Sequence, residues 1–213
     1  MKTDDLVALL AADAQPVPPR AASHRLGWAL VAALPLSLAF MLAEYGLRPG
    51  LLASLAQPMP LIKLLVPAAI AAAGFVALER LGRPGVPARG AWAGMVLPVL
   101  LFWVLGIAAW AGAAPEARPE LLWGRTWRSC AFSISAMALP VFVAAFLVLR
   151  SLAPTRPVQA GAAAGAFAGG AGAAVYALHC PEFGGPFLAV WYVIGMAIPV
   201  VAGALLGPRL LRW

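Results

Sequence analysis

Residues 129–149 read SCAFSISAMALPVFVAAFLVL and contain no charged side chain. A helix needs about 20 consecutive apolar residues to cross the hydrocarbon core of a bilayer. This stretch meets that requirement and is far longer than an ordinary β-strand of about five or six residues. It therefore predicts a transmembrane helix.

Five further stretches of the chain have the same character. They span residues 26–43, 64–78, 90–115, 157–181 and 183–208. The second reaches spanning length from Leu61 if the stem of Lys63 lies in hydrocarbon while its ammonium extends to the interface. The sequence CPEFGGP at residues 180–186 predicts a tight reversal between the last two stretches. We therefore expect an all-α polytopic membrane bundle of six transmembrane helices over residues 26–213, preceded by a short tail, residues 1–25.

The composition supports this class. Hydrophobic residues make up 63% of the 213-residue chain and charged residues 11%, and the mean hydropathy is +0.89. Soluble domains carry roughly 25% charged residues, so most of the outer surface is expected to face lipid. The net charge of +7 comes from basic residues that stand singly or in pairs beside apolar stretches. They indicate topology, and no direct contact with nucleic acid is expected.

The distribution of basic residues predicts the orientation. With a cytoplasmic N-terminus, the inner segments hold Lys2, Arg20, Arg25, Arg80, Arg83, Arg89, Arg150, Arg156, Arg209 and Arg212, and the outer ones hold Arg48, Lys63, Arg118, Arg125 and Arg128. Positive charge near helix ends resists translocation, so both termini are expected to be cytoplasmic. Residues 121–128 carry two of the outer arginines. Trp123 and Trp127 there share one helical face, which predicts a short interfacial helix.

The N-terminal tail begins MKTDDLVALLAAD and contains a short amphipathic pattern. Its candidate partner-binding residues are Thr3, Asp4, Asp5, Leu6, Leu9, Leu10 and Asp13. The threonine suits a helix N-cap and the next two aspartates suit the positive end of a helix dipole. A helix of roughly ten residues is marginal alone in water, and the proline-rich segment after it is an extended spacer. The pattern predicts a helix that folds into a partner's groove, and the alternative is a frayed tail without a role.

Glycines recur at four-residue spacing in the last two stretches. They are Gly161, Gly165 and Gly169 in one and Gly203 and Gly207 in the other. Small residues at this spacing let helix backbones approach closely, so they predict packing inside the bundle. Five stretches also contain a proline, at positions 35, 67, 98, 140 and 199. We interpret these prolines as ordinary for membrane helices and not as functional hinges.

The motifs of common enzymes are absent from the sequence. It contains no phosphate-binding loop, no His-Glu-x-x-His and no Cys-x-x-Cys. Charged residues also avoid the middle of every stretch, whereas proton-coupled transporters usually keep ionisable groups near the bilayer centre. The sequence therefore disfavours an enzyme and a conventional transporter.

Cys130 and Cys180 fall at ends of stretches that emerge on the same side of the membrane. With a cytoplasmic N-terminus, that side is the oxidising bacterial periplasm. His179 and Glu182 flank the second cysteine, so two thiolates with an imidazole and a carboxylate could hold a soft metal ion. Cys130, Cys180 and His179 are the candidate metal ligands. The residues alone leave three interpretations open: a sensor, a permanent disulfide, or two inert buried thiols.

Several segments resemble one known family. They are the opening MKTDDL with Leu9, Leu10 and Asp13, the sequences RSC at 128–130 and HCPE at 179–182, and the C-terminal part from Trp191 and Tyr192 through Gly195 and Met196 to the final LLRW. These segments resemble the NrsF family of six-helix inner-membrane anti-sigma factors, which restrain a sigma factor of the extracytoplasmic-function class. The resemblance implies that the tail holds the sigma factor and that the paired cysteines respond to metal or oxidative stress.

The expected function is therefore that of a multi-pass anti-sigma factor of the bacterial inner membrane, and not of an enzyme. Its partners would be an extracytoplasmic-function sigma factor and the lipid bilayer. No resident cofactor is expected, although a heavy-metal ion could bind transiently at the cysteine pair. Two alternatives come from other classes. One is a membrane thiol oxidoreductase with a bound quinone, which the missing Cys-x-x-Cys disfavours, and the other is a small transporter.

Overall fold

The computed structural model describes residues 3–12, 21–83 and 85–212. Within these residues the chain forms helices and their connections and no strand, which confirms the all-α class. The elements are α1 (Thr3–Ala12), α2 (Ala21–Glu44), α3 (Leu51–Ser54), α4 (Pro58–Leu81), α5 (Arg89–Gly112), α6 (Arg118–Trp123), α7 (Trp127–Leu152), α8 (Pro157–Ala177), α9 (Gly185–Phe187), the π-helical segment η1 (Leu188–Tyr192) and α10 (Val193–Leu210).

Within the described residues, six helical segments are long and apolar enough to cross a membrane, as predicted. They are Gly27–Glu44, Pro58–Leu81, Arg89–Gly112, Arg118–Leu152, Pro157–Ala177 and Gly185–Leu210. The five prolines singled out in the sequence lie inside α2, α4, α5, α7 and α10, and each helix continues through its proline.

The predicted interfacial helix at residues 121–128 is wrong in its extent. The helix α6 ends at Trp123, Gly124 adopts a φ of +51°, and α7 begins at Trp127. A positive φ is readily adopted only by glycine, so Gly124 separates the two helices and Arg128 belongs to the following span. The rings of Trp123 and Trp127 nevertheless meet, with centroids 4.8 Å apart.

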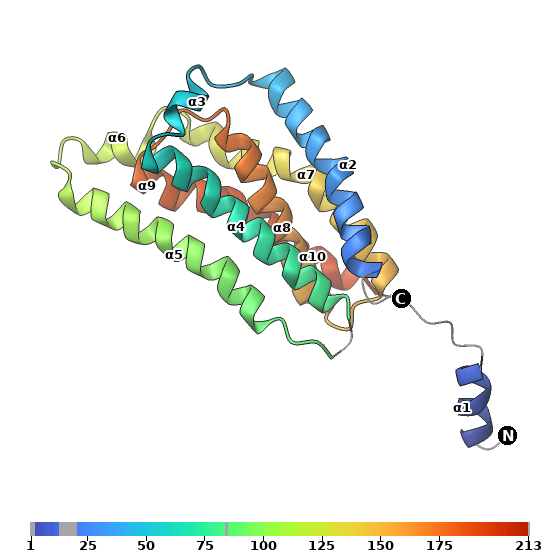
Figure 1. Cartoon of the computed structure of the whole chain (residues 1–213). Coiled ribbons are helices and arrows are strands. Elements are labelled where there is room, and N and C mark those ends of the chain that lie inside the picture. Colours follow the sequence, from blue (N-terminus) through green and yellow to red (C-terminus); the bar gives the residue numbers. More distant parts are fainter. Residues whose placement is uncertain (1–2, 13–20, 84, 213) are drawn as a thin grey trace.

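Helix α8 forms the centre of the bundle, and 78% of its span is buried. Helices α4, α7 and α10 pack around it (Figure 1). A Cβ added at Gly161 would lie 2.0 Å from the carbonyl oxygen of Gly203, and one at Gly165 would lie 2.1 Å from that of Pro199. The backbones of α8 and α10 therefore touch, and the predicted packing of the glycines inside the bundle is confirmed.

The bundle has two ends that differ in what they contain. The start of α2 and the end of α10 lie at one end, here called the proximal end (Figure 1). The short helices α3, α6 and α9 lie at the other, the distal end. Figure 1 shows α1 apart from the six spans, beyond the proximal end.

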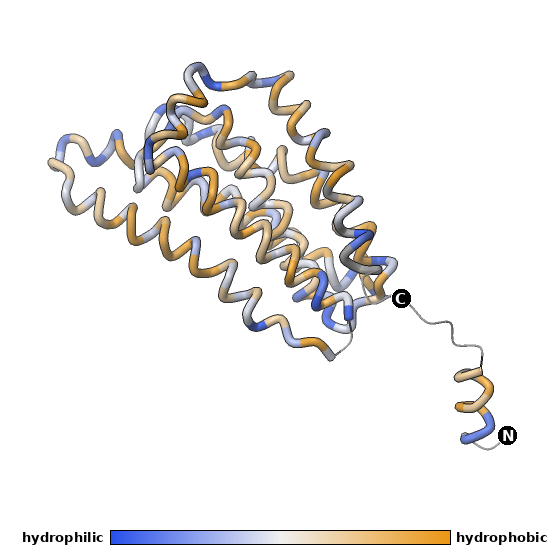
Figure 2. The backbone as a smooth tube through the Cα atoms, viewed as in Figure 1, coloured by the Kyte–Doolittle hydropathy of each residue, from blue (hydrophilic) through white to orange (hydrophobic). Residues whose placement is uncertain are grey.

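The spans consist mostly of apolar residues, as the hydropathy colouring in Figure 2 shows, and many of these residues lie on the outer surface. Large apolar side chains such as Leu97 on α5, Leu147 on α7 and Leu205 on α10 are more than 60% exposed. Such a surface would be costly in water, because roughly 25 cal/mol is lost for each Å² of apolar area left exposed. It suits helices that face lipid.

Candidate functional site

Cys130 and Cys180 lie side by side at the distal end, although fifty positions separate them in the chain. The amide of Cys130 in the first turn of α7 donates to the Thr126 carbonyl at 2.9 Å, and that of Cys180 donates to the Tyr176 carbonyl at 3.0 Å. Both side chains are fully buried, and both thiols are free. The two side chains lie near enough for their sulfurs to interact.

Lys63 on α4 brings a buried ammonium group to the thiol loop, residues 178–184. Its side chain is 1% exposed, and Nζ donates to the carbonyl oxygens of Cys180 and Glu182, both at 2.7 Å. The ammonium thus extends to the loop at the distal end of the bundle, where two carbonyl oxygens accept its hydrogen bonds in place of water. A charged residue inside an apolar stretch marks a candidate functional site by default, and that signal could have identified Lys63.

Arg48, between α2 and α3, adds a second positive charge to the thiol loop. Its Nη1 donates to the Cys180 carbonyl at 3.1 Å, and its guanidinium carbon lies 4.6 Å from the centre of the Phe183 ring. The Nζ of Lys63 lies 5.0 Å from the centre of the same ring. Both cations therefore hold the loop through a carbonyl oxygen and an aromatic face.

These surroundings lower the pKa of the Cys180 thiol below its usual value. The neighbouring Cys130 thiol, as a hydrogen-bond donor, has the largest effect, and the Lys63 ammonium acts in the same direction while burial opposes both. The thiolate is the form of cysteine that attacks oxidants and binds metals. The Cys130 thiol and the Lys63 ammonium therefore favour the reactive form of Cys180.

The carboxylate of Glu182 ties the thiol loop to the segment that leads into α7. Its Oε1 accepts a hydrogen bond from the amide of Arg125 at 2.7 Å and from the hydroxyl of Thr126 at 3.4 Å. Because the Thr126 carbonyl in turn accepts from the Cys130 amide, the two cysteines are held together by a short chain of bonds. The carboxylate serves this link and does not point to a metal set.

His179 lies against the connection that follows α2. Its Nδ1 is 3.1 Å from the carbonyl oxygen of Gly46, and its ring centre is 5.1 Å from that of Tyr45. In residues 3–12, 21–83 and 85–212, no group of three or more His, Cys, Asp or Glu side chains is placed to hold a metal ion. The structure thus brings the two cysteines together and leaves out the third ligand of the predicted metal set.

Tyr192 completes the surroundings of the thiols. Its side chain is fully buried, and its ring centre lies 5.1 Å from the Nζ of Lys63. Its hydroxyl lies near the Cys180 sulfur, yet it has no hydrogen-bond partner among the residues that the structure describes. Leaving a buried hydroxyl unpaired costs about 1–3 kcal/mol. Only the fold brings Tyr192, Lys63 and Arg48 to the cysteines.

The predicted partner-binding residues lie on α1 as far as they are described. This helix contains Thr3, Asp4, Asp5, Leu6, Leu9 and Leu10. Leu6 and Leu9 are 43% and 64% exposed, while Asp13 and the side chain of Leu10 fall outside the described residues. An exposed apolar stripe on a short helix is a surface that a partner's groove can cover.

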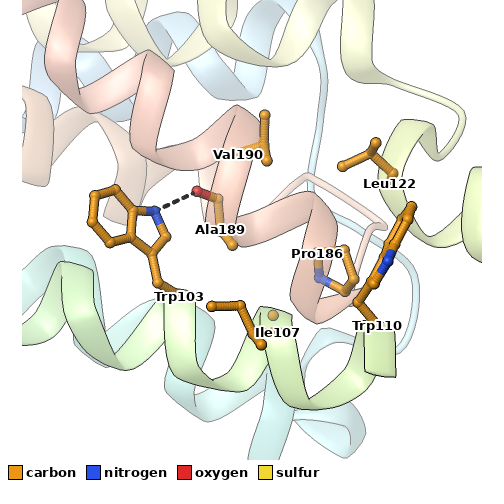
Figure 3. Close-up of a pocket in the computed structure, with 8 residues that line it drawn as sticks. Trp103, Ile107, Trp110, Leu122, Pro186, Ala189 and Val190 are labelled. Atoms are coloured by element: carbon orange, nitrogen blue, oxygen red, sulfur yellow. Dashed lines mark hydrogen bonds between the residues drawn. The ribbon is translucent and has the colours of Figure 1, made fainter. Parts of the chain in front are cut away.

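An apolar pocket of about 390 Å³ lies near the distal end, between α5 and the segment formed by α9 and η1 (Figure 3). Trp103 and Trp110 of α5 line it opposite Pro186 and Val190. The indole Nε1 of Trp103 donates to the Ala189 carbonyl at 3.0 Å (Figure 3). The residues that line this pocket include no cysteine and no charged side chain, so it is not part of the thiol site.

Comparisons with known proteins match this chain to one family over nearly its whole length. The family model described as NrsF, negative regulator of sigma F, matches residues 10–213. A probable anti-sigma-F factor NrsF of Azospira oryzae is 41% identical over 217 aligned positions, and the anti-sigma-F factor NrsF of Caulobacter vibrioides is 39% identical over 221. Both alignments cover the whole of this chain and the whole of the relative, and both relatives are named as regulators rather than enzymes. No solved structure matches the chain.

The family model and the two full-length relatives point to the same family as the resemblance in the tail and around the cysteines. With six helices of spanning length arranged as a bundle, the chain belongs to the NrsF family, the negative regulators of sigma F.

Proposed function

We propose that this chain is a membrane-bound anti-sigma factor that holds an extracytoplasmic-function sigma factor through α1 and releases it when Cys130 and Cys180 meet an oxidant or a soft metal ion. Membership of the NrsF family supports the anti-sigma activity. The observation that carries the sensing role is the contact of two cysteines fifty positions apart, at the end of the bundle opposite the start of α2.

The helix α1 has the surface chemistry that a sigma-binding element requires. Leu6 and Leu9 give it an exposed apolar stripe, and Asp4 and Asp5 give it an acidic first turn. An acidic surface facing the basic, DNA-contacting groups of a sigma factor would compete directly with promoter phosphates. The tail would thus inhibit transcription by occupying the surface that DNA needs.

The thiol site favours an event between two sulfurs. Disulfide formation joins Cys130 and Cys180, releases two protons and passes two electrons to an oxidant in the same compartment. A soft metal ion bridging the two thiolates would have a similar effect. A tetrahedral zinc site needs four ligands, and the structure gathers only two cysteines here. We therefore favour the disulfide, with a heavy-metal ion as a transient inducer and no resident cofactor.

Helices α2 and α7 provide the route from the thiols to the tail. At the distal end the hydroxyls of Tyr45 and Ser133 lie 3.0 Å apart, and at mid-height the Ser37 hydroxyl donates to the Met137 carbonyl at 2.8 Å. At the proximal end Arg25 Nη1 donates to the hydroxyl of Ser151 at 3.1 Å. Cys130 lies in the first turn of α7, and α2 follows the tail. A shift of α7 at the sulfurs would therefore be carried to the base of the tail.

The charge at the two ends supports a cytoplasmic proximal end. Among the described residues, the proximal end of the bundle holds eight arginines and one acidic residue, Glu79, whereas the distal end holds five basic and four acidic residues. Positive charge near helix ends favours the cytoplasmic side. The thiols would then face the periplasm across the inner membrane from the sigma factor.

A membrane thiol oxidoreductase is the less favoured function. Both sulfurs are fully buried, so a protein substrate has no access to them in this conformation. Turnover of such substrates requires an exposed, low-pKa thiol. Burial suits a sensor that reacts with small molecules.

The sigma-binding role can be tested by copurification from membranes. The full-length chain is expected to copurify a sigma factor, and deletion of residues 2–13 or the substitution Leu9→Asp is expected to release it, because a buried leucine contributes several kcal/mol at a packed site. Ala8→Asp is the matched control. It adds the same charge to the opposite face of α1 and is expected to leave binding nearly unchanged.

Undiminished copurification after the deletion would refute the role of α1. Loss of the protein from the membrane fraction would instead show a defect in insertion, so membrane content is measured for each variant. Equal release by Leu9→Asp and Ala8→Asp would show that charge, and not the apolar stripe, controls binding.

A further inference from the structure

A second candidate site lies at the proximal end, away from the thiols. It is an open cavity of about 580 Å³ formed by the end of α4, the connection to α5, and the first turns of α5 and α8. Arg80, Arg89 and Arg156 line it from these three segments, together with Gln159 and the apolar side chains of Val86 and Trp92. Its volume falls within the range of about 300–1,000 Å³ that is typical of ligand pockets.

Among the described residues, no acidic side chain neutralises the charges that line this cavity. No acidic residue occurs among the described residues that line it. Glu79, the one acidic residue described at this end of the bundle, pairs with Arg83 at 2.9 Å. Arg80 Nη1 donates to the Pro87 carbonyl at 3.2 Å. Three guanidinium groups that face one cavity without a counter-charge repel one another, so an anion that enters it is stabilised.

Two helix N-termini add to the positive potential. The residues that precede α5 and α8 are Ala88 and Arg156, and neither provides a side-chain cap for the first amides. The first N–H groups of a helix lack internal partners and carry the positive end of its dipole. Gly90 and Gln159, in these first turns, both line the cavity. The first turns of two helices and three guanidinium groups therefore line the same cavity.

The position of the cavity indicates an amphipathic ligand. It opens where three apolar spans end, and Trp92 gives it an aromatic wall. Below it on α5, Val96 and Leu97 are 53% and 63% exposed on the outer face of the bundle. A phosphate group in the cavity would leave acyl chains to lie along this apolar face. Basic pockets between spans on the cytoplasmic side are suited to anionic lipid headgroups.

We propose that the cavity formed by Arg80, Arg89 and Arg156 binds the headgroup of an anionic phospholipid. The phosphodiester accepts hydrogen bonds from the guanidinium groups and from amides in the first turns of α5 and α8, those of Gly90 and Gln159. The lipid thereby joins the α4–α5 connection to the start of α8. This site is independent of sigma binding and of the thiols.

The test uses the purified full-length protein in a neutral detergent. Native mass spectrometry counts bound phosphatidylglycerol, and the shift of the thermal unfolding midpoint on adding phosphatidylglycerol, phosphatidylcholine or inorganic phosphate gives the affinity. Phosphatidylglycerol is expected to bind and to raise the midpoint, and the other two are expected to have little effect. Each of Arg89→Gln and Arg156→Gln is expected to weaken binding about fivefold, and the double variant about 25-fold.

The matched control removes the same charges from the distal end. The double variant Arg125→Gln and Arg128→Gln is expected to bind phosphatidylglycerol as the wild type does. Equal binding by both double variants would overturn the site, since net charge would then explain it. Equal stabilisation by inorganic phosphate would overturn the lipid assignment and show a site for free anions. If the double variant at the cavity fails to fold, the two single variants supply the same comparison.

Discussion

At the distal end Lys63 and Arg48 are held by backbone carbonyls and aromatic rings, whereas at the proximal end Arg89 and Arg156 line an open cavity. The two distal cations have hydrogen-bond partners within the protein, and the thiol pair beside them is buried. The side chains of Arg89 and Arg156 instead have no hydrogen-bond or ion-pair partner within the described chain, and Leu6 and Leu9 of α1 are exposed. The difference favours a chemical reaction of the thiols at the distal end and the binding of external partners at the proximal end.

This interpretation of the two ends depends on a topology in which they lie on opposite sides of the membrane. Reporter fusions after Pro84 and Pro154 are expected to report the cytoplasm, and fusions after Pro58 and Pro181 the periplasm, because the basic residues are concentrated at the proximal end. The effect is all or none. A periplasmic signal from the fusion after Pro84 would show that the bundle has the opposite orientation, with the thiols on the cytoplasmic side.

The thiol pair is expected to control the response completely. Cys130→Ser and Cys180→Ser should each abolish induction of the sigma-dependent genes by oxidant or metal while sigma copurification persists, because one sulfur cannot form the disulfide. The double variant should be no worse than either single one. Ser129→Ala, an exposed neighbour of Cys130, is the control and should respond normally. A full response of the double variant would show that sensing lies elsewhere.

The close contact of α8 with α10 is expected to contribute strongly to the stability of the bundle. A Cβ at Gly165 would lie 2.1 Å from the Pro199 carbonyl oxygen, so Gly165→Ala must push two backbones apart. We expect the free energy of unfolding to fall by about 1–3 kcal/mol. Gly112→Ala, with no atom within 4 Å of the added Cβ, should change it little. Thermal unfolding in detergent measures both, and equal midpoints would contradict the close contact.

Lys63 is expected to set the pH range over which the thiols react. The pKa of Cys180 lies below its usual value, so its thiolate persists as the pH falls and is lost only when the pH drops through the lowered pKa. In Lys63→Met the ammonium is absent and the pKa of Cys180 rises. At a pH below the wild-type pKa, the thiolate fraction, and with it the rate of disulfide formation by hydrogen peroxide, should fall about tenfold for each unit of that rise.

The pH midpoint of the rate separates this effect from a loss of structure. It should move upward in Lys63→Met and return toward the wild-type value in Lys63→Arg, which restores the positive charge. Arg125→Gln removes an exposed charge at the same end and should leave the midpoint in place. An unchanged midpoint in Lys63→Met would mean that the ammonium only holds the loop carbonyls.

The smallest expected effect tests the route between the ends. Ser151→Ala removes the acceptor of the hydrogen bond from Arg25, and such a bond contributes about 0.5–1.5 kcal/mol. The oxidant concentration that gives half-maximal release should therefore shift by a few-fold, up to about tenfold. Thr155→Ala, an exposed residue in the next connection, should give no shift. An identical response of the two variants would remove this contact from the route.

The sequence predicts local features of this fold well. The spans follow from the length of apolar stretches, and the packing of the glycines inside the bundle follows from their four-residue spacing, because both are properties of a single segment. The pairing of α2 with α7 could not be predicted, since helices in lipid are apolar on every face and show no periodic stripe. The break at Gly124 was missed because a tryptophan pattern continued across it.

The candidate site was predicted only in part. Cys130 and Cys180 were identified because they fall at stretch ends on one side, but their neighbours depend on tertiary structure. Lys63 was assigned to the interface because an isolated ammonium in lipid is costly, and the carbonyls that bind it come from a loop more than one hundred positions away. His179 adjoins Cys180 in sequence, yet it packs against Tyr45.

The contact between α8 and α10 has a mechanical consequence. Gly161 and Gly203 have no side-chain torsions, so the contact between the two helices cannot adjust by a change of rotamer. Cys180 stands near the tip of the hairpin that these two helices form. A force on its sulfur, such as that of a new disulfide, is therefore expected to move α8 and α10 together. The compensating rearrangement would occur at their contact with α7.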